Sequence, residues 1–176
     1  MKKTAGSNPL CLECALCCNG VIFANGQLQP EDDVERLRHL GLRLLANRKA
    51  QTAPPKFAQP CAALDGCRCQ IYAERPAYCR AFECALLKKF KAGEVEAPAA
   101  LRIIRTARRR AEKVKTLLRE LGDANEGEAL SVRFRRTQRR AEAGGLDEES
   151  ADRFGELTLA MQDLNFQLST AFYPGG

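Results

Sequence analysis

The sequence is poor in several features that mark secreted, membrane-bound or nucleotide-using proteins. Its first residues, MKKTAGSNPL, are basic, but Cys11 follows them where a secretory signal would continue as an apolar run. No membrane-length apolar stretch is visible, so we expect a cytoplasmic protein with no membrane partner. The sequence has no Gly-rich strand-to-helix turn for a nucleotide-like cofactor and no His-assisted nucleophile. The one histidine, His39, lies one position off the apolar row of a predicted helix, so we expect it on the surface. We therefore expect no catalytic activity of its own.

Cysteine, in contrast, is abundant, and all nine cysteines lie in two short segments. Two residues separate Cys11 from Cys14, and two separate Cys14 from Cys17, so a turning backbone can direct three sulfurs to one point. Tetrahedral zinc and iron–sulfur clusters both need such convergence. Cys18 must face elsewhere, because adjacent side chains diverge, and it serves a second centre or bridges two. We therefore expect more than one metal centre. The predicted ligands are Cys11, Cys14, Cys17, Cys18, Cys61, Cys69, Cys79 and Cys84.

A disulfide framework is the main alternative for so many cysteines, because small secreted domains are often built that way. The lack of a visible signal sequence argues against it. Nine is an odd number of thiols, and Cys17 could pair with Cys18 only in a strained vicinal bond, since their Cα atoms lie closer than ordinary disulfide geometry allows. We therefore expect thiolates that bind metal.

The cysteine pattern resembles that of a known family. It reads C-x-x-C-x-x-C-C, followed by C-x-x-L-x-G-x-x-C-x-I-Y-x-x-R-P-x-x-C-R-x-F-x-C. It is similar to the pattern of the bacterial CxxCxxCC, or YkgJ-like, family of zinc- or iron-chelating domains, and it covers roughly the first half of the chain. Besides the eight cysteines, the matching residues are Leu64, Gly66, Ile71, Tyr72, Arg75, Pro76, Arg80 and Phe82. Cys67 stands at a position that we expect to vary in the family, so we interpret it as a spare thiol, with a ninth ligand as the alternative.

The resemblance leaves the metal open between zinc and iron. Spacing of the C-x-x-C-x-x-C kind is typical of loops that wrap an iron–sulfur cubane. Zinc accepts any four thiolates that reach a tetrahedron, and eight thiolates satisfy two ions, or three through bridging sulfurs if Cys67 joins. Eight thiolates on two centres leave about four uncompensated negative charges. We expect nearby basic residues to offset them, unless Arg75 and Arg80 cap helices or pair with Glu74 and Glu83. These basic residues are Arg68, Arg75, Arg80, Lys88 and Lys89.

The sequence predicts a mainly α fold. In its first half we expect irregular loops held together by metal and one short β-hairpin. The hairpin is expected at Asn25-Gly26, a dipeptide that favours tight turns. Helices are predicted over residues 30–41, 42–53 and 76–93. The last of these carries Cys79 and Cys84, which are five residues apart, somewhat more than one turn, so their pairing stays open.

The second half contains no cysteine, and its apolar residues recur at helical spacing. Two rows, over residues 98–122 and after Asp147, predict long helices, and a shorter helix is expected between them, ended by Gly144-Gly145. A helical hairpin or a three-helix package follows. We therefore predict a cysteine-cluster metal-binding domain over residues 1–92 and a helical extension over 93–176.

Two functions other than metal binding stay open. The same cysteine domain occurs in proteins described as flagellin lysine N-methylases, so the resemblance also implies a subunit or remnant of a protein-modifying enzyme. Alternatively, the basic helices bind nucleic acid around a structural zinc core, because residues 98–140 hold 13 Lys and Arg against 5 Asp and Glu, a charge of +8. The arginines in question are Arg102, Arg105, Arg108, Arg109, Arg133, Arg136, Arg139 and Arg140.

The charge of the last helix favours internal pairing over nucleic acid. Residues 141–176 hold 1 Arg against 7 Asp and Glu, a charge of −6, and we expect these acids to lie against the arginines. The acids concerned are Glu148, Glu149, Asp152, Glu156 and Asp163. The stacking aromatics of a single-strand binder are also lacking. Metal ions are therefore the expected partners, and a partner protein is a further prediction.

Overall fold

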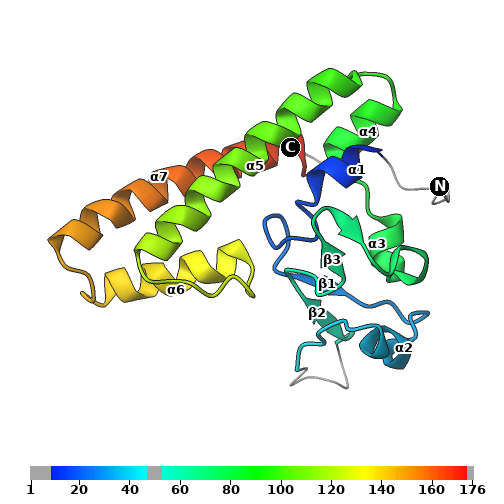
Figure 1. Cartoon of the computed structure of the whole chain (residues 1–176), viewed down its shortest axis with the longest axis horizontal. Helices are drawn as coiled ribbons and strands as arrows, with labels where there is room; N and C mark the ends of the chain where they lie inside the picture. The colour runs from blue at the N-terminus through cyan, green and yellow to red at the C-terminus, as the bar shows by residue number, and fades with distance from the viewer. Residues whose placement is uncertain (1–8, 47–52, 174–176) are drawn as a thin grey trace.

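The computed structural model describes residues 9–46 and 53–173 of the chain. Figure 1 shows a layer of three long helices on one side and a group of short helices and strands on the other. The long helices are α5 (Ala97–Glu120), α6 (Leu130–Glu142) and α7 (Glu148–Ala171). All three lie in the cysteine-free half, so the predicted helical extension is confirmed. None of the helices in the described ranges is long and apolar enough to cross a membrane.

Helices α5 and α7 form the main packing unit, and each begins and ends where its sequence dictates. Buried side chains recur along α5 three or four positions apart, from Ala100 to Leu118, and they pack against α7. The carboxylate of Asp147 accepts a hydrogen bond from the backbone N–H of Ser150 at 2.9 Å and caps α7. After α5 the chain turns at Gly122, whose φ of 80° favours glycine.

Helix α6 buries an arginine where apolar residues were expected. Its buried side chains are Leu130, Arg133 and Thr137, and Phe134 is only half-buried, where its ring stacks on that of Phe154. Arg133 is 2% exposed, and its Nε lies 3.0 Å from the carboxylate of Asp123. A buried arginine needs such a partner, because an unpaired charge is costly away from water.

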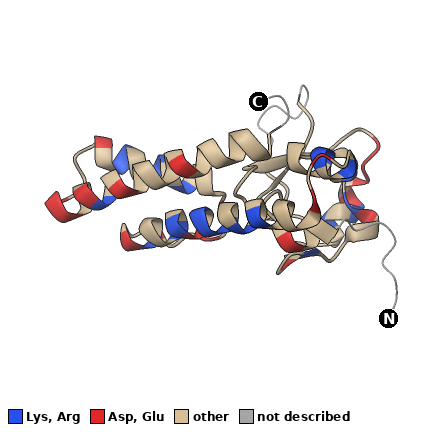
Figure 2. Cartoon of the chain, turned by 90° about the horizontal axis from the view of Figure 1, so that it is seen from above, with Lys and Arg blue, Asp and Glu red and all other residues tan. Residues whose placement is uncertain are grey.

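Several arginines of the predicted nucleic-acid set already bind other groups of the protein, although Figure 2 shows Lys and Arg recurring along the helices. Arg133 and Arg136 both pair with Asp123, and Arg136 also pairs with Glu128. Arg140 donates to a backbone carbonyl, that of Leu121. The expected pairing with α7 is present once, as the Arg110 Nε to Asp163 bridge of 2.8 Å. Nucleic-acid binding stays a prediction, carried by Arg102, Arg105, Arg109 and Arg139.

The short elements contain two pairs of antiparallel strands, and the predicted hairpin is in the wrong place. Strand β1 (Asn25–Gln27) contains the Asn25-Gly26 dipeptide and pairs with the distant β2 (Lys56–Ala58), with Gly26 opposite Phe57. A Cβ on Gly26 would lie 2.1 Å from the Phe57 ring, so this glycine permits close packing instead of a turn. The short hairpin is formed by β3 (Leu64–Asp65) and β4 (Arg68–Cys69), and Gly66 turns with a φ of 57°.

The helices predicted before the second cysteine segment are shorter than expected. Helix α2 (Val34–His39) begins only after Asp33, whose carboxylate accepts a hydrogen bond from the N–H of Arg36 at 2.9 Å. The prediction over residues 42–53 is wrong for residues 42–46, since Leu44 bridges to Phe57 in extended conformation. Residues 47–52 lie outside the described residues. Tertiary pairing with β2 overrides the local helical preference here.

The single helix predicted over residues 76–93 is two helices. They are α3 (Ala77–Ala81), preceded by a 3₁₀ turn at Tyr72–Glu74, and α4 (Ala85–Lys91). Between them Phe82 adopts extended backbone, and its ring packs edge-on against Phe23 with centroids 5.0 Å apart. The break places Cys79 on α3 and makes Cys84 the residue that caps the start of α4.

The described residues form two hydrophobic cores. The larger core joins α5 and α7 to α1 (Pro9–Cys14), Leu16, Val21 and Leu86. The smaller core lies under β1 and β2, and its buried members are Leu28, Leu37, Leu42, Phe57, Ala63 and Ile71. Because the larger core takes residues from both sides of position 92, the predicted domain boundary stays a prediction.

Candidate metal centre

The first cysteine segment owes its shape to a left-handed residue. Cys11 and Cys14 lie on α1, which ends at Ala15, a non-glycine residue with a φ of 56°. The Ala15 carbonyl then accepts hydrogen bonds from the N–H groups of Cys18 and Asn19, each at 2.9 Å. A left-handed alanine costs about 1–2 kcal/mol, so its surroundings must hold it in place. The sharp turn lets Cys17 return toward the sulfurs of α1.

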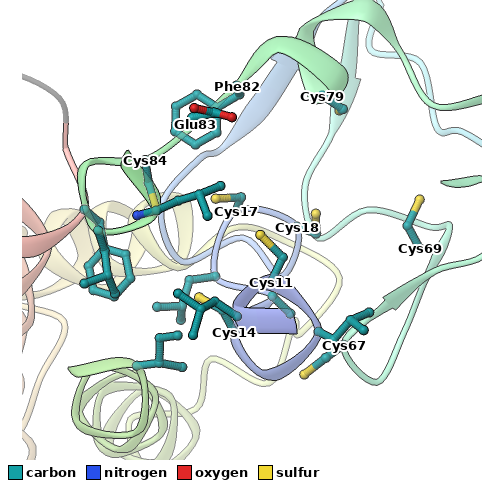
Figure 3. Close-up of a pocket in the computed structure, with 18 of the residues that line it drawn as sticks. Cys11, Cys14, Cys17, Cys18, Cys67, Cys69, Cys79, Phe82, Glu83 and Cys84 are labelled. Atoms are coloured by element: carbon teal, nitrogen blue, oxygen red, sulfur yellow. The ribbon is translucent and has the colours of Figure 1, made fainter. Parts of the chain in front are cut away.

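One set of four cysteines lies beside the larger core, and we call it the first set. It consists of Cys11, Cys14, Cys17 and Cys84. Cys14 is buried in that core and Cys84 packs against it. Figure 3 shows these four side chains as neighbours, with Cys84 entering from the chain that precedes α4. The N–H of Ala85 donates to the carbonyl of Phe172 at 3.0 Å, which ties Cys84 to the end of α7.

Burial, and then the charges of neighbouring thiols, raises the pKa values of the first set. The pKa of Cys14 is raised to about 12 by burial and by the negative charges of Cys84 and Cys11, against a lowering backbone hydrogen bond from Leu16. Burial, then Cys84, also raises the pKa of Cys11. The pKa of Cys17 is raised well above its ordinary value by burial, and then by Cys14, Cys18, Cys84 and Cys11. Each of these three thiols therefore responds to other members of the set.

The other four predicted ligands form the second set, beside the smaller core. It consists of Cys18, Cys61, Cys69 and Cys79. Cys61, Cys69 and Cys79 all pack against that core. The chain brings them together from the turn after α1, the loop after β2, strand β4 and helix α3. A backbone hydrogen bond of 2.8 Å from the N–H of Cys61 to the carbonyl of Cys18 joins two of these segments.

The second set shows the same mutual influence. The pKa of Cys18 is raised to about 12, first by burial and then by the charges of Cys79, Cys61 and Cys69 of this set and of Cys11 of the first set. The pKa of Cys79 also rises to about 12, through burial and then through Cys61 and Cys69. Burial, and then Cys69, raises the pKa of Cys61, against lowering contributions from a backbone hydrogen bond and from Arg43. The neighbours Cys17 and Cys18 therefore lie in different sets.

The sulfurs open onto one cavity of about 330 Å³, which eight of the nine cysteines line, Cys61 being the exception. Apolar side chains such as Leu16, Leu86 and Phe172 complete its wall. All nine cysteines are free thiols. Within residues 9–46 and 53–173, no group of three or more Cys, His, Asp or Glu side chains is arranged so that it could hold a metal ion as it stands. The two sets are therefore defined by which thiols influence one another and by the core that they pack against, and not by a preformed metal geometry.

The ninth cysteine, Cys67, is placed apart from both sets. It lies in the turn between β3 and β4, and its sulfur accepts a hydrogen bond from Arg108 Nη1 at 3.3 Å. In Figure 3 this sulfur points away from those of Cys18 and Cys69. The same Arg108 nitrogen donates to the carbonyl of Glu13 at 2.7 Å, so one side chain of α5 forms hydrogen bonds with both cysteine segments. The sequence offers no signal for this contact, because Arg108 is far from every cysteine along the chain.

The basic residues near the second segment divide into two groups. Arg75 and Arg80 line the cavity, and Arg80 Nη1 donates to the Arg75 carbonyl at 2.7 Å, whereas Arg68, Lys88 and Lys89 are exposed. Arg75 and Arg80 do not form the alternative ion pairs with Glu74 and Glu83. Glu74 binds Arg36 at 2.7 Å, and Glu83 binds Lys91, a cavity residue that the sequence prediction did not include.

These features define a cysteine-rich metal-chelating domain, and a comparison with protein families agrees. A family model named CxxCxxCC, described as "Putative zinc- or iron-chelating domain", matches residues 10–101, which is more than half of the chain and includes every cysteine. The chain belongs to this family. No curated protein and no solved structure matches the chain. The predicted relation to lysine N-methylases stays a prediction.

Proposed function

We propose that the protein binds metal at two centres, each held by four thiolates. The first set, Cys11, Cys14, Cys17 and Cys84, holds one centre, and the second set, Cys18, Cys61, Cys69 and Cys79, holds the other. The observation that carries this proposal is the division of the eight thiols by mutual charge and by core. Most of the thiol charges that raise a member's pKa come from its own set, the exceptions being Cys18 acting on Cys17 and Cys11 acting on Cys18. Cys14 and Cys84 pack with the larger core, whereas Cys61, Cys69 and Cys79 pack with the smaller one.

The donor chemistry suits the metals that the family chelates. Four thiolates in one place bind zinc or an iron–sulfur cluster and are unsuited to hard ions such as magnesium or calcium. Burial keeps the thiols protonated without metal, so binding releases protons from these sulfurs. Apolar side chains line much of the cavity, and their low polarity strengthens the attraction between a metal ion and the thiolates.

Two observations favour iron–sulfur clusters over bare ions. The cavity of about 330 Å³, which cysteines of both sets line, is larger than bare ions need. The N–H of Leu87 donates to the Cys84 sulfur at 3.4 Å, the kind of hydrogen bond that tunes the potential of cluster ligands. The cysteines would hold such a cluster near the apolar end of α7, where it would supply one-electron chemistry.

Anaerobic purification followed by iron, zinc and labile-sulfide analysis tests the metal. A brown protein containing iron and sulfide supports the iron–sulfur form, and a colourless preparation containing two zinc ions replaces it with the zinc form. A preparation that contains no stoichiometric metal under reducing conditions would contradict the proposal.

The division into sets is tested by two matched pairs of substitutions. Cys17→Ser combined with Cys84→Ser removes two ligands of one set, so it should cost one centre. Cys17→Ser combined with Cys18→Ser removes one ligand from each set, so the protein should lose the metal of both centres. Equal metal loss in the two double variants contradicts the division. Cys67→Ser is the control, and it should leave the metal content unchanged.

A further inference from the structure

Arg75 holds a buried donor that the protein itself does not use. The residue ends the 3₁₀ turn at Tyr72–Glu74, and its guanidinium carbon lies 3.9 Å from the centroid of the Tyr72 ring. Its Nε is shielded from solvent and has no hydrogen-bond partner within the described part of the chain. An unsatisfied buried donor costs about 1–3 kcal/mol, and more when it is charged. Because Arg75 also lines the cysteine cavity, a ligand in that cavity can supply the missing acceptor.

The position of Arg75 differs from that of the other basic residues around the cysteines. Its charge acts on Cys11 of the first set and on Cys79 of the second set. Lys91 acts on Cys11, and Arg108 acts on Cys14, so both belong with the first set. The guanidinium of Arg75, which lies over the Tyr72 ring, is placed where its charge influences one member of each set.

We propose that Arg75 is a positioning residue and counter-ion shared by both metal centres, with its unused Nε–H donating to a metal-bound sulfur. The proposal rests on the two-centre function above. Four thiolates on Zn²⁺, or on a cubane core of charge about +2, leave each centre with about two negative charges. A guanidinium offsets that charge and is less strongly hydrated than an ammonium, so it suits a half-buried place between the two.

The test measures metal affinity by chelator competition in single-centre proteins. Cys17→Ser leaves only the second centre, and Cys18→Ser leaves only the first. In both backgrounds Arg75→Gln should weaken metal binding about 10- to 100-fold, the usual loss when a residue that supports metal ligands is removed. Lys91→Gln is the matched control, and it should act only where the first centre is intact.

Arg75→Lys separates charge from geometry. It keeps the positive charge but loses the planar Nε–H, so it should restore affinity only in part at both centres. Circular dichroism verifies that each variant is folded, and Arg75→Lys serves alone if Arg75→Gln is not. An Arg75 substitution that changes neither centre, or only one, overturns the proposal. A wild-type protein with fewer than two centres overturns the proposed function itself, so the two failures are distinct.

A second observation, independent of the metal, concerns the outer face of α7. On α7, Leu159 is 68% exposed and Phe166 is 71% exposed, and Tyr173, which follows the end of the helix, is 36% exposed. The three recur every seven residues. Gly155, Gln162 and Ser169 lie exposed on the same face with the same spacing. Residues 157–173 contain a single charge, that of Asp163, which is paired with Arg110. A heptad spacing of exposed apolar residues is typical of a helix that packs on another helix.

We infer that this outer face binds α7 of a second copy in antiparallel orientation. An axis of two-fold symmetry between Gln162 and Asp163 places Leu159 against Phe166 of the other copy, and Phe166 against its Leu159, so the face is complementary to itself. Antiparallel packing also separates the acidic first turns of the two α7 helices, which Figure 2 shows in red at one end of the layer. Parallel packing would bring those charges together.

Sedimentation or light scattering over a concentration series tests the inference. The wild type should form a dimer, whereas Leu159→Lys and Phe166→Glu should each be monomeric at concentrations where the wild type is dimeric. Mixing these two variants should restore a dimer, because antiparallel packing brings the lysine against the glutamate and leaves the other contact apolar. The double variant Arg102→Glu with Arg109→Glu, which changes exposed residues of α5 at the same spacing, is the control.

Three outcomes would count against this dimer. A wild type that stays monomeric at every concentration excludes it, and a dimer that persists in both single variants places the contact elsewhere. A mixture that stays monomeric, while the wild type is a dimer, excludes the antiparallel arrangement.

Discussion

The cysteine-bearing part and the helical layer differ in what stabilises them. The helical layer is built from α5 and α7, each of 24 residues, with a continuous row of buried side chains between them. The cysteine-bearing part consists of elements of two to seven residues, and its own core has six buried members. So small a core cannot offset the entropy of ordering its chain, and such domains usually need a metal or a disulfide. Local order in this part therefore depends on what the thiols bind.

Removing the metal should break this comparison most clearly. Structural zinc contributes about 10–16 kcal/mol to the folding of small domains, far more than any one side chain. After treatment with a strong chelator, hydrogen exchange should accelerate over residues 53–71 and hardly change in α5 and α7. Equal loss of protection in both parts would mean that they fold as one unit.

The buried ion pair of the helical layer should give the largest effect of a single substitution. Asp123 accepts hydrogen bonds from Arg136 and Arg133, which hold the pKa of its carboxyl below the usual value although burial alone would raise it. Asp123→Ala leaves Arg133 charged and buried without its partner, so it should cost about 3–5 kcal/mol in urea unfolding. The control is Asp163→Ala, which breaks an exposed pair and should cost less than about 1 kcal/mol.

One substitution in each core sharpens the difference between the two parts. Phe57→Ala and Leu164→Ala both remove fully buried side chains, and each should cost about 2–5 kcal/mol. Only the first should also release metal, because Cys61, Cys69 and Cys79 pack against the core that contains Phe57. Metal content after gel filtration distinguishes them. Retention of all metal by Phe57→Ala would show that the second set does not depend on its core.

The pH dependence of the metal-free, reduced protein should follow its buried thiols. Burial raises the pKa of Cys14 and Cys18 to about 12, from a usual value near 9. The neutral thiols therefore contribute stability that is complete below about pH 9 and is lost as the pH rises toward 12. Urea midpoints at pH 8 and pH 10.5 measure this loss. Cys14→Ala removes one of these groups, so its midpoint should fall less over the same interval.

The smallest expected effect concerns the backbone at Ala15. Glycine adopts a positive φ without strain, so Ala15→Gly should stabilise the first cysteine segment by up to about 1 kcal/mol. Chelator competition should show equal or slightly tighter metal binding. Gly41, with a φ of 90°, is the reverse case, and Gly41→Ala should destabilise the protein by a similar amount. Looser binding after Ala15→Gly would show that the alanine methyl group has a packing role.

Helix prediction succeeded where local preference and tertiary packing agree. The apolar rows of α5 and α7 extend over six to seven turns, and their caps, such as Asp147, lie where the sequence signals them. It failed in the cysteine-bearing part, because long-range contacts there outweigh short-range signals. Gly26 looks like a turn residue, but it lies in a strand because the Phe57 ring covers it. The helix expected through Cys84 breaks because Phe82 packs onto Phe23.

For the site, the sequence by itself determined the family pattern of eight cysteines, and it predicted that Cys17 and Cys18 face different ways, since adjacent side chains diverge. Which partners each of them joins was decided only by the tertiary structure. The break before α4 carries Cys84 to the larger core and leaves Cys79 at the smaller one, so the set of each cysteine follows from packing between distant segments. The same holds for Arg108, which donates a hydrogen bond to the sulfur of Cys67 although 41 positions separate the two residues along the chain.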